Sequence, residues 1–307
     1  MIGRTVEVAQ DGRHLSVLRG FLVVKEKGEE VGRVPLDDIG VLLCNAHGLT
    51  YSTNLVTALS ERGAPVVFCG RNHQPAAIAL PIQGHHRQTA RTRAQIEASR
   101  PLRKSLWKSL IRAKVGIQGA VLEHLGKPAG AFQRLAASVR SGDPDNVEAQ
   151  AARRYWPLLM GEDFRRDSDG DGANALLNYG YTILRSATAR SVIAAGLHPS
   201  VGVHHESQYN ALCLVDDLME PFRPIVDLVV FRLLEAGRAE VDAETKAALA
   251  DVLAFDMEGE AGVTPLATCL HRLATSLGQS YEIGKAALVL PKQPLPLELS
   301  TAGRAGT

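Results

Sequence analysis

Short apolar runs separated by turn residues dominate the first eighty positions of the chain. Five of these runs favour β-strands, at positions 5–9, 15–18, 21–25, 31–34 and 39–44. A helix is expected from about Thr53 to Arg62, ended by Gly63, and it leads into a buried run at 65–68 and a last strand at 76–80. The pattern predicts a small β domain over residues 1–80.

The pattern changes after position 80. Residues 81–86 are predicted to be a linker that contains Pro81 and Gly84, and beyond them the apolar positions recur with helical period and almost no β signal. An all-α domain is expected over 87–292, followed by an extended tail over 293–307. The predicted fold class is therefore α+β, with a small N-terminal β domain followed by a larger all-α C-terminal domain.

Composition agrees with two soluble domains but does not identify them. The chain has 307 residues, of which 45% are hydrophobic and 22% charged. The first residues lack the apolar core of a signal peptide, and no run approaches the ~18 residues that span a membrane. We therefore expect a cytoplasmic protein with no membrane partner.

The net charge of +1 hides a strongly basic segment. Positions 87–134 carry eleven Lys or Arg against only Glu97 and Glu123, a local charge of +9. Many of these cations recur about every four residues in a helical pattern, so they can share a face toward DNA phosphates. Arg103, Lys104 and Lys108 are the candidates for such contacts. The alternative is a solvated helix, for which alternating charge signs would be expected.

The segment Val203–Asp227 contains the first candidate chemistry, because a His pair precedes Glu220 by about fifteen residues. The apolar run at 212–215 predicts a short buried helix, and Pro221 places Glu220 at its end. An anion there opposes the helix dipole by roughly 0.3–1 kcal/mol, which suggests a compensating cation nearby. That cation is either a divalent metal or Arg223, which could pair with Asp216, Asp217 and Glu220.

A second acidic candidate, Glu148, lies in a predicted helix that begins with Asp143 as N-cap and Pro144 at its first position. The positions one helical repeat away are small or aromatic, so the stripe that carries Glu148 is expected to face the interior. A buried carboxylate needs a partner. Either Arg153 or Arg154 turns toward it, or a metal binds.

The helix expected from Asn174 onward has a polar stripe where a core stripe would be apolar. Asn174, Asn178, Tyr181 and Arg185 are spaced four, three and four apart and share one face. The stripe either lines a groove that takes phosphates or forms a satisfied internal hydrogen-bond network, and we favour the groove. Arg223 is a further candidate for phosphate contact.

Three long motifs resemble a known family. They are NVEAQAARRYW around Glu148, NALLNYGYTILRSATARSVIAAGLHPSVGVHH from 174 to 205, and DLMEPFRPIVD from 217 to 227. The chain is similar over nearly its whole length to the CRISPR-associated spacer-acquisition integrases, the first of the Cas proteins, in the variety that accompanies type II systems.

The resemblance implies the metal ligands. In that family a Glu, a His and an acidic residue hold the ion, and these fall on Glu148, His205 and Glu220 here, with many members carrying Asp at the third position. One imidazole nitrogen with two carboxylate oxygens suits Mg²⁺ or Mn²⁺. Asp216 and Asp217 are expected to support these ligands. The sequence leaves open whether His204 contributes, although motif spacing favours His205.

The resemblance also implies a reaction and partners. The 3′-OH ends of a short prespacer DNA would be joined by transesterification to the ends of a CRISPR repeat beside its leader. A homodimer through the β domains and a complex with the small second Cas protein are implied, and contacts with other type II Cas proteins are left open. The alternatives are a metal-dependent branched-DNA nuclease and a non-catalytic DNA-binding scaffold.

Overall fold

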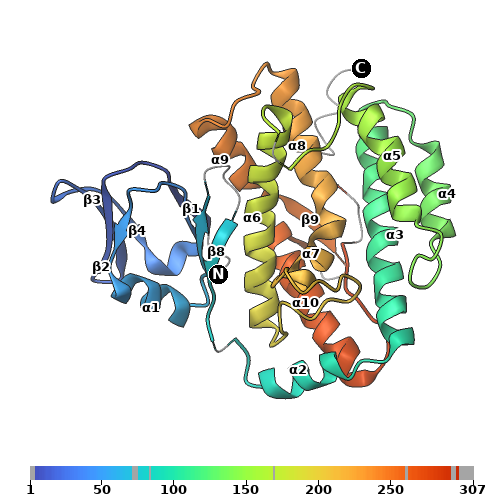
Figure 1. The fold of residues 1–307 in the computed structure, drawn as a ribbon, viewed down its shortest axis with the longest axis horizontal. Helices are drawn as coiled ribbons and strands as arrows, with labels where there is room; N and C mark the ends of the chain where they lie inside the picture. Colours follow the sequence, from blue (N-terminus) through green and yellow to red (C-terminus); the bar gives the residue numbers. More distant parts are fainter. Residues whose placement is uncertain are drawn as a thin grey trace. The chain divides into compact units, whose positions relative to one another are not determined.

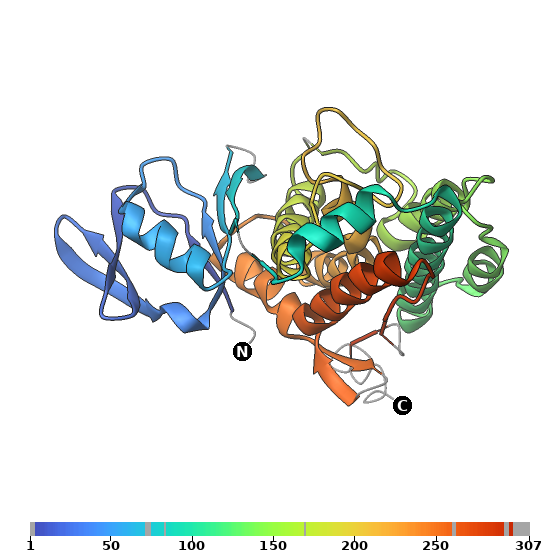
Figure 2. The ribbon, with the colours of Figure 1, turned by 90° about the horizontal axis from the view of Figure 1, so that it is seen from below.

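The computed structural model describes residues 4–70, 75–82, 84–168, 170–259, 262–291 and 295–296. The chain divides into two compact units, Met1–His86 and Arg87–Thr307, which are shown as ribbons in Figures 1 and 2. None of the helices in these described ranges is both long and apolar enough to cross a bilayer.

The N-terminal unit contains two four-stranded sheets. In the first, of order β1-β5-β7-β8, the first three strands are parallel and the last is antiparallel. In the second, of order β4-β3-β2-β6, two hairpin pairs are antiparallel and β2 pairs with β6 in parallel. The strands are β1 (Arg4–Val8), β2 (Arg13–Leu18), β3 (Phe21–Glu26), β4 (Glu29–Pro35), β5 (Ile39–Cys44), β6 (Thr50–Tyr51), β7 (Val66–Cys69) and β8 (Pro75–Ala79).

Helix α1 (Thr53–Glu61) packs on these strands and shows how local chemistry sets its ends. The Ser52 hydroxyl accepts a hydrogen bond from the Leu55 amide at the N-terminus, and Gly63 takes a left-handed φ of 69° just beyond the C-terminus. Leu55 and Leu59 are buried with Leu15, Leu22 and Leu42 in one apolar core. Each predicted strand and the predicted helix of this unit is present to within a few residues, and the α+β class is confirmed.

The C-terminal unit is mostly helical, with α6 buried at most of its positions and packed against α7, α8, α9 and α10. Helix α3 packs against α4, α5 and α8 (Figure 1), and α2 lies beside α10 (Figure 2). The helices are α2 (Gln88–Ile96), α3 (Arg100–His124), α4 (Gly130–Ser138), α5 (Val147–Met160), α6 (Ala173–Ala194), α7 (Cys213–Met219), α8 (Arg223–Glu235), α9 (Ala243–Asp251) and α10 (Leu266–Ile283), with 3₁₀ turns η1 (Leu36–Asp38) in the first unit and η2 (Glu220–Phe222) and η3 (Val252–Ala254) in the second.

The expectation of an all-α second domain is wrong in one place. An antiparallel hairpin, β9 (Asp256–Gly259) with β10 (Gly262–Pro265), precedes α10. Its strands of four residues are too short to give a period-2 pattern, and Met257 is its only fully buried side chain among the described positions. The predicted tail at 293–307 lies almost entirely outside the described residues.

Candidate active site

Glu148 lies in the first turn of α5, which begins at Val147 after the N-cap Asn146. The predicted start at Asp143 and Pro144 is therefore three residues too early. Asp143 still serves the helix, because its two carboxylate oxygens accept hydrogen bonds from the amides of Val147 and Glu148 at 2.9 and 3.0 Å. This double contact fixes the first turn and, with it, the direction of the Glu148 side chain.

Glu220 follows the last residue of α7, as the sequence predicted, and begins the 3₁₀ turn η2 before α8. Pro221 and Pro224 stand in the first turns of η2 and α8, where a missing amide proton costs no helical hydrogen bond. The Glu220 side chain is only 7% exposed. Its carboxylate is therefore carried on a rigid and buried junction between two helices.

One ammonium joins these two carboxylates. Lys114 Nζ on α3 lies 2.6 Å from Glu148 Oε1 and 2.5 Å from Glu220 Oε2, so the two oxygens are at most 5.1 Å apart. The sequence offered Arg153 or Arg154 as the partner of Glu148, but both are exposed. Lys114 was missed because the sequence presents it only as one more cation in a basic segment.

A second cation reaches Glu220 from the next helical turn. Arg223 Nε lies 3.1 Å from Glu220 Oε1, which confirms one of the three pairings that the sequence allowed. Burial alone would raise the pKa of the Glu220 carboxyl, but Arg223 and Lys114 outweigh it and hold this pKa below its ordinary value. Glu220 is thus kept ionised although it is buried.

His205 is oriented by Asp217 and lies within electrostatic reach of the two glutamates. Its Nδ1 is 2.5 Å from Asp217 Oδ1, and Asp217 is fully buried. The hydrogen bond to Asp217 raises the pKa of the His205 imidazole, burial opposes this, and the charges of Asp217, Glu220 and Glu148 raise the pKa further. The side chain is 49% exposed, so a polar face remains open to a ligand.

The loop that carries His205 is wrapped around the Asp217 carboxylate. Oδ2 accepts hydrogen bonds from the amides of Val203 and His204 at 2.6 and 2.9 Å. Gly202 allows this close approach, since a Cβ there would lie 2.3 Å from the His205 carbonyl oxygen and 2.9 Å from Asp217 Oδ2. Asp217 therefore sets the position of the whole histidine loop.

His204 points elsewhere. Its ring stacks on Trp107 with centroids 4.3 Å apart and an interplanar angle of 5°. His205 is the imidazole that Asp217 holds at 2.5 Å and on which the charges of Glu148 and Glu220 act.

Asp216 and its neighbour Asp217 have different hydrogen-bond partners. Its carboxylate accepts two hydrogen bonds from Arg185, at 2.7 and 2.8 Å, and one from Asn210. Only Asp217 of the two predicted supporting acids contacts His205.

The polar stripe of α6 forms internal hydrogen bonds, the second of the two alternatives drawn from the sequence. Asn174 and Asn178 accept from Arg166, and Arg185 pairs with Asp216. The Tyr181 hydroxyl donates to Asp227 at 2.5 Å. Each member of the stripe thus has a partner within the chain.

Two guanidinium groups lie over the ring of Tyr181. The Arg166 and Arg223 Cζ atoms are 5.5 and 5.0 Å from its centroid. Arg166 makes its hydrogen bonds to neutral oxygens, those of Asp167 O, Asn174 and Asn178. Arg166 was not expected from the sequence, where its only signal is its place just before the polar stripe.

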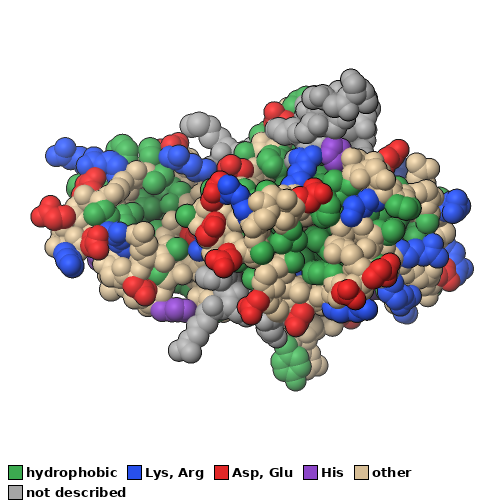
Figure 3. Space-filling view, turned by 90° about the horizontal axis from the view of Figure 1, so that it is seen from above, with side chains coloured by type: hydrophobic (Ala, Val, Ile, Leu, Met, Phe, Trp, Pro, Cys, Tyr) green, Lys and Arg blue, Asp and Glu red, His purple; other side chains and the backbone are tan. Residues whose placement is uncertain are grey.

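The cations of α3 fall into separate groups. Lys104 is exposed and Lys108 half-buried, whereas Arg103 pairs with Glu206 at 2.8 Å. Figure 3 shows further Lys and Arg side chains gathered with a few acids toward the edge that carries α4 and α5. The two lysines are the better placed of the three predicted contacts to meet an external phosphate.

Glu148, Glu220 and His205 offer two carboxylates and an imidazole, donor types that suit a hard divalent ion. Among the described residues no three carboxylate, imidazole or thiol groups already surround one point at metal-binding distance, and Lys114 occupies the space between the two glutamates. That ammonium is a stand-in cation on two carboxylate oxygens. Glu220 Oε2 is buried and has the Lys114 ammonium at 2.5 Å, so its partner is already a cation.

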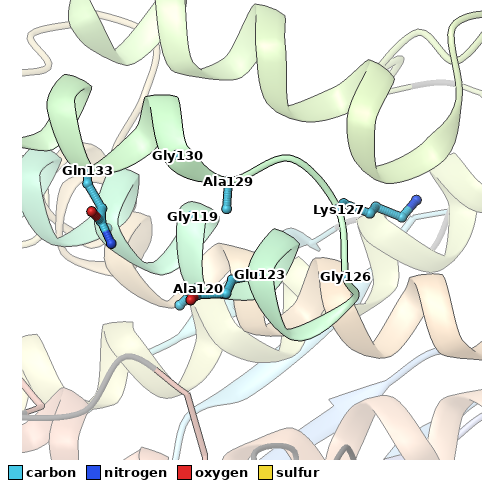
Figure 4. A pocket seen from close by; sticks show the side chains of 9 residues that line it. Gly119, Ala120, Glu123, Gly126, Lys127, Ala129, Gly130 and Gln133 are labelled. Carbon is cyan, nitrogen blue, oxygen red and sulfur yellow. The ribbon is translucent and has the colours of Figure 1, made fainter.

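A separate hollow of about 530 Å³ lies between α3, α4 and the turn that joins them. Figure 4 shows its lining, which includes Gly119, Glu123, Lys127 and Gln133. Small residues let the helices approach here, since a Cβ on Gly119 would lie 2.8 Å from Phe132 Cβ. The hollow contains none of the site residues described above.

Comparisons with known proteins agree with this arrangement. Residues 6–253 match the family model described as CRISPR associated protein Cas1. The chain is 39% identical over 235 residues to a CRISPR-associated endonuclease Cas1 from Neisseria meningitidis, covering 76% of this chain and 77% of that protein. It is 30% identical over 294 residues to a second relative of that name from Pyrobaculum aerophilum, covering 90% and 98%.

Solved structures share the fold. A casposase bound to integration product superposes with a TM-score of 0.82 at 21% identity, covering 96% of this chain and 95% of that one. A Cas1 protein from Thermotoga maritima superposes with a TM-score of 0.75 at 15% identity, covering 92% and 98%. On the family model and the relatives together, this chain belongs to the Cas1 family of CRISPR-associated proteins.

Proposed function

We propose that this chain is a metal-dependent DNA integrase and endonuclease of CRISPR adaptation. The 3′-OH of a short prespacer DNA attacks a phosphodiester at the end of a CRISPR repeat. A new P–O bond forms to the incoming 3′ oxygen while the P–O bond to the 3′ oxygen of the repeat strand breaks. The observation that carries the proposal is the meeting of Glu148 and Glu220 on one cation beside His205.

Glu148, His205 and Glu220 are the residues that would hold Mg²⁺ or Mn²⁺. When bound, the ion would lower the pKa of the attacking hydroxyl and neutralise charge on the phosphodiester. Asp217 engages Nδ1 of His205, so Nε2 is the ring nitrogen that would bind the ion. Two carboxylates and one imidazole make an oxygen-rich donor set, which suits these ions better than structural zinc.

The cations around the site would hold the DNA. Arg223 and Arg166 lie together on the Tyr181 ring, and the hydrogen bonds of Arg166 within the described residues go to neutral oxygens, so its charge is available to a phosphate. Lys104 and Lys108 on α3 extend the positive surface. Tyr181 and the rest of the α6 stripe, Asn178 and Arg185, would act by positioning these groups, because their own polar atoms are engaged within the chain.

Partners are proposed from the relatives. The fold also matches a chain in a Cas6-RT-Cas1–Cas2 complex, with a TM-score of 0.71 at 17% identity and covering 95% of this chain but 36% of that one. We propose a homodimer through the β unit, bridged to a second such dimer by the small second Cas protein, with prespacer and leader-repeat DNA as substrates. Assignment to the type II variety is supported by the 39% identity with the Neisseria protein.

The test is strand joining of a 3′-OH prespacer to a leader-repeat duplex, with and without Mn²⁺. Glu220→Gln should abolish joining while duplex binding persists. Glu206→Gln is the matched control, because this exposed acid follows His205 directly but pairs with Arg103 outside the site. Normal joining by Glu220→Gln would remove the proposed site.

The same assay separates the alternatives. A branched-DNA nuclease would cleave a branched substrate with Mn²⁺ but join nothing. A non-catalytic scaffold would bind duplex DNA and do neither.

A further inference from the structure

Lys114 departs from the other cations of its helix. Arg100, Lys104, Lys108 and Arg112 follow one another at intervals of four along α3, and three of them are exposed. Lys114 falls outside this spacing, and its side chain is only 13% exposed. A phosphate-binding role shared with these four cations therefore does not explain the position of Lys114.

The environment of Lys114 is that of a counter-ion. Its ammonium contacts Glu148 Oε1 and Glu220 Oε2, two oxygens that cannot be more than 5.1 Å apart. Two carboxylates this close repel each other, most strongly where burial has removed water. Arg223 meets only the other oxygen of Glu220, so Lys114 is the cation that bridges the pair.

A divalent ion would use the same two oxygens. Oxygen ligands lie about 2.0–2.1 Å from Mg²⁺, which leaves no space between them for an ammonium at hydrogen-bond distance from both. We propose that Lys114 is a built-in counter-ion of the metal site, which keeps Glu148 and Glu220 together in the metal-free protein and must leave them when the metal binds. This inference rests on the metal site of the proposed function.

The consequence is a metal site that is formed before metal arrives. The acids need not spread apart or take up protons in the empty protein, because Lys114 lies between them and Arg223 balances the second charge. The cost is weaker metal binding, since each binding event breaks two ion pairs. Removing the ammonium should therefore have opposite effects on stability without metal and on metal affinity.

The experiment compares Lys114→Met with Lys108→Met, a change on the same helix outside the glutamate pair. Mn²⁺ affinity is measured by calorimetry, and melting temperature is measured in EDTA and in saturating Mn²⁺. We expect Lys114→Met to bind Mn²⁺ at least tenfold more tightly, equivalent to about 1.4 kcal/mol. Its melting temperature should fall in EDTA and return to the wild-type value with Mn²⁺, while Lys108→Met matches wild type in both.

Unchanged or weaker Mn²⁺ binding by Lys114→Met would overturn the inference and leave the metal site standing. If neither the wild-type protein nor Lys114→Met binds Mn²⁺ more tightly than a Glu220→Gln variant does, the proposed metal site is wrong, and the inference is wrong with it. A test on the wild-type protein covers the case in which Lys114→Met does not fold. Acetylation of Lys114, followed by mass spectrometry, should be at least threefold faster with Mn²⁺ than without it, while Lys108 is unchanged; equal rates at Lys114 would refute its displacement.

Discussion

Asp217→Asn is the substitution whose consequences the structure predicts most fully. The carboxylate is completely buried and accepts hydrogen bonds on both oxygens. Asn keeps one oxygen, which can stay with the amides of Val203 and His204. Its NH₂ group would then face His205 Nδ1 and the His205 amide, which lie 2.5 and 3.4 Å from Oδ1. The NH₂ group is a hydrogen-bond donor and would face two other donors, the Nδ1–H and the backbone N–H of His205.

The magnitude follows from these two contacts. Hydrogen bonds to a charged group contribute about 1.5–3 kcal/mol each, and the longer of the two is weak, so we expect a loss of about 3 kcal/mol in the free energy of unfolding. The pKa of His205 should fall, because the hydrogen bond to Asp217 is the largest cause of its rise. Loss of the carboxylate that orients a metal-binding imidazole typically lowers the metal affinity by about 10–100-fold.

Urea unfolding, NMR titration of His205 and Mn²⁺ calorimetry measure the three effects separately. Asp216→Asn is the control, because this neighbouring acid binds Arg185 and Asn210 instead of the histidine. It should leave the His205 pKa in place. The reasoning is refuted if Asp217→Asn leaves that pKa unchanged, or if Asp216→Asn lowers it as much.

Three further predictions concern other parts of the helical unit. Burial raises the pKa of Asp227 from 3.8 to about 7, so the folded chain holds a proton that the unfolded chain has lost. The free energy of unfolding should fall by at most about 4 kcal/mol as the pH rises through that window, and Asp227→Asn should flatten the curve in urea titrations at several pH values. Changing Lys104 and Lys108 together to Gln should reduce the slope of log affinity for duplex DNA against log salt by about two, and an unaltered slope would place DNA elsewhere. Gly180→Ala would put a Cβ 2.5 Å from Val226 Cγ1 and should destabilise by about 1–3 kcal/mol, and Val226→Ala in the same chain should recover part of this if overpacking is the cause.

Local patterns predicted the first unit well. Its strands are short runs rich in apolar residues, and its turns contain glycines at positive φ such as Gly12, Gly20 and Gly28, so each boundary is marked within a few residues. The start of α5 was missed by three residues because Asp143 caps it from a distance. Its carboxylate reaches the Val147 and Glu148 amides across a turn in which Asp143 and Asn146 both have positive φ.

The candidate site was predictable in its acids and its histidine pair, but not in what surrounds them. The motifs at 148, 204–205 and 220 supplied the residue types, and the expected burial of Glu148 and the helix-end position of Glu220 each called for a cation. Which cation pairs with the two acids depends on how α3 packs against α5 and η2. No periodicity within α3 shows that Lys114 contacts both of them. The same holds for Arg166, which reaches the Tyr181 ring from the preceding loop.

The sequence by itself determined the two-unit α+β organisation, the end of α7 at Glu220 and the acidic and imidazole groups on offer, since these depend on neighbours a few residues apart. Only the tertiary structure decided that Asp217 holds His205 within reach of the glutamate charges while His204 stacks on Trp107, and that Lys114 lies between Glu148 and Glu220. Those choices are made by packing and by the need to neutralise buried charge, and both act between residues that are distant along the chain.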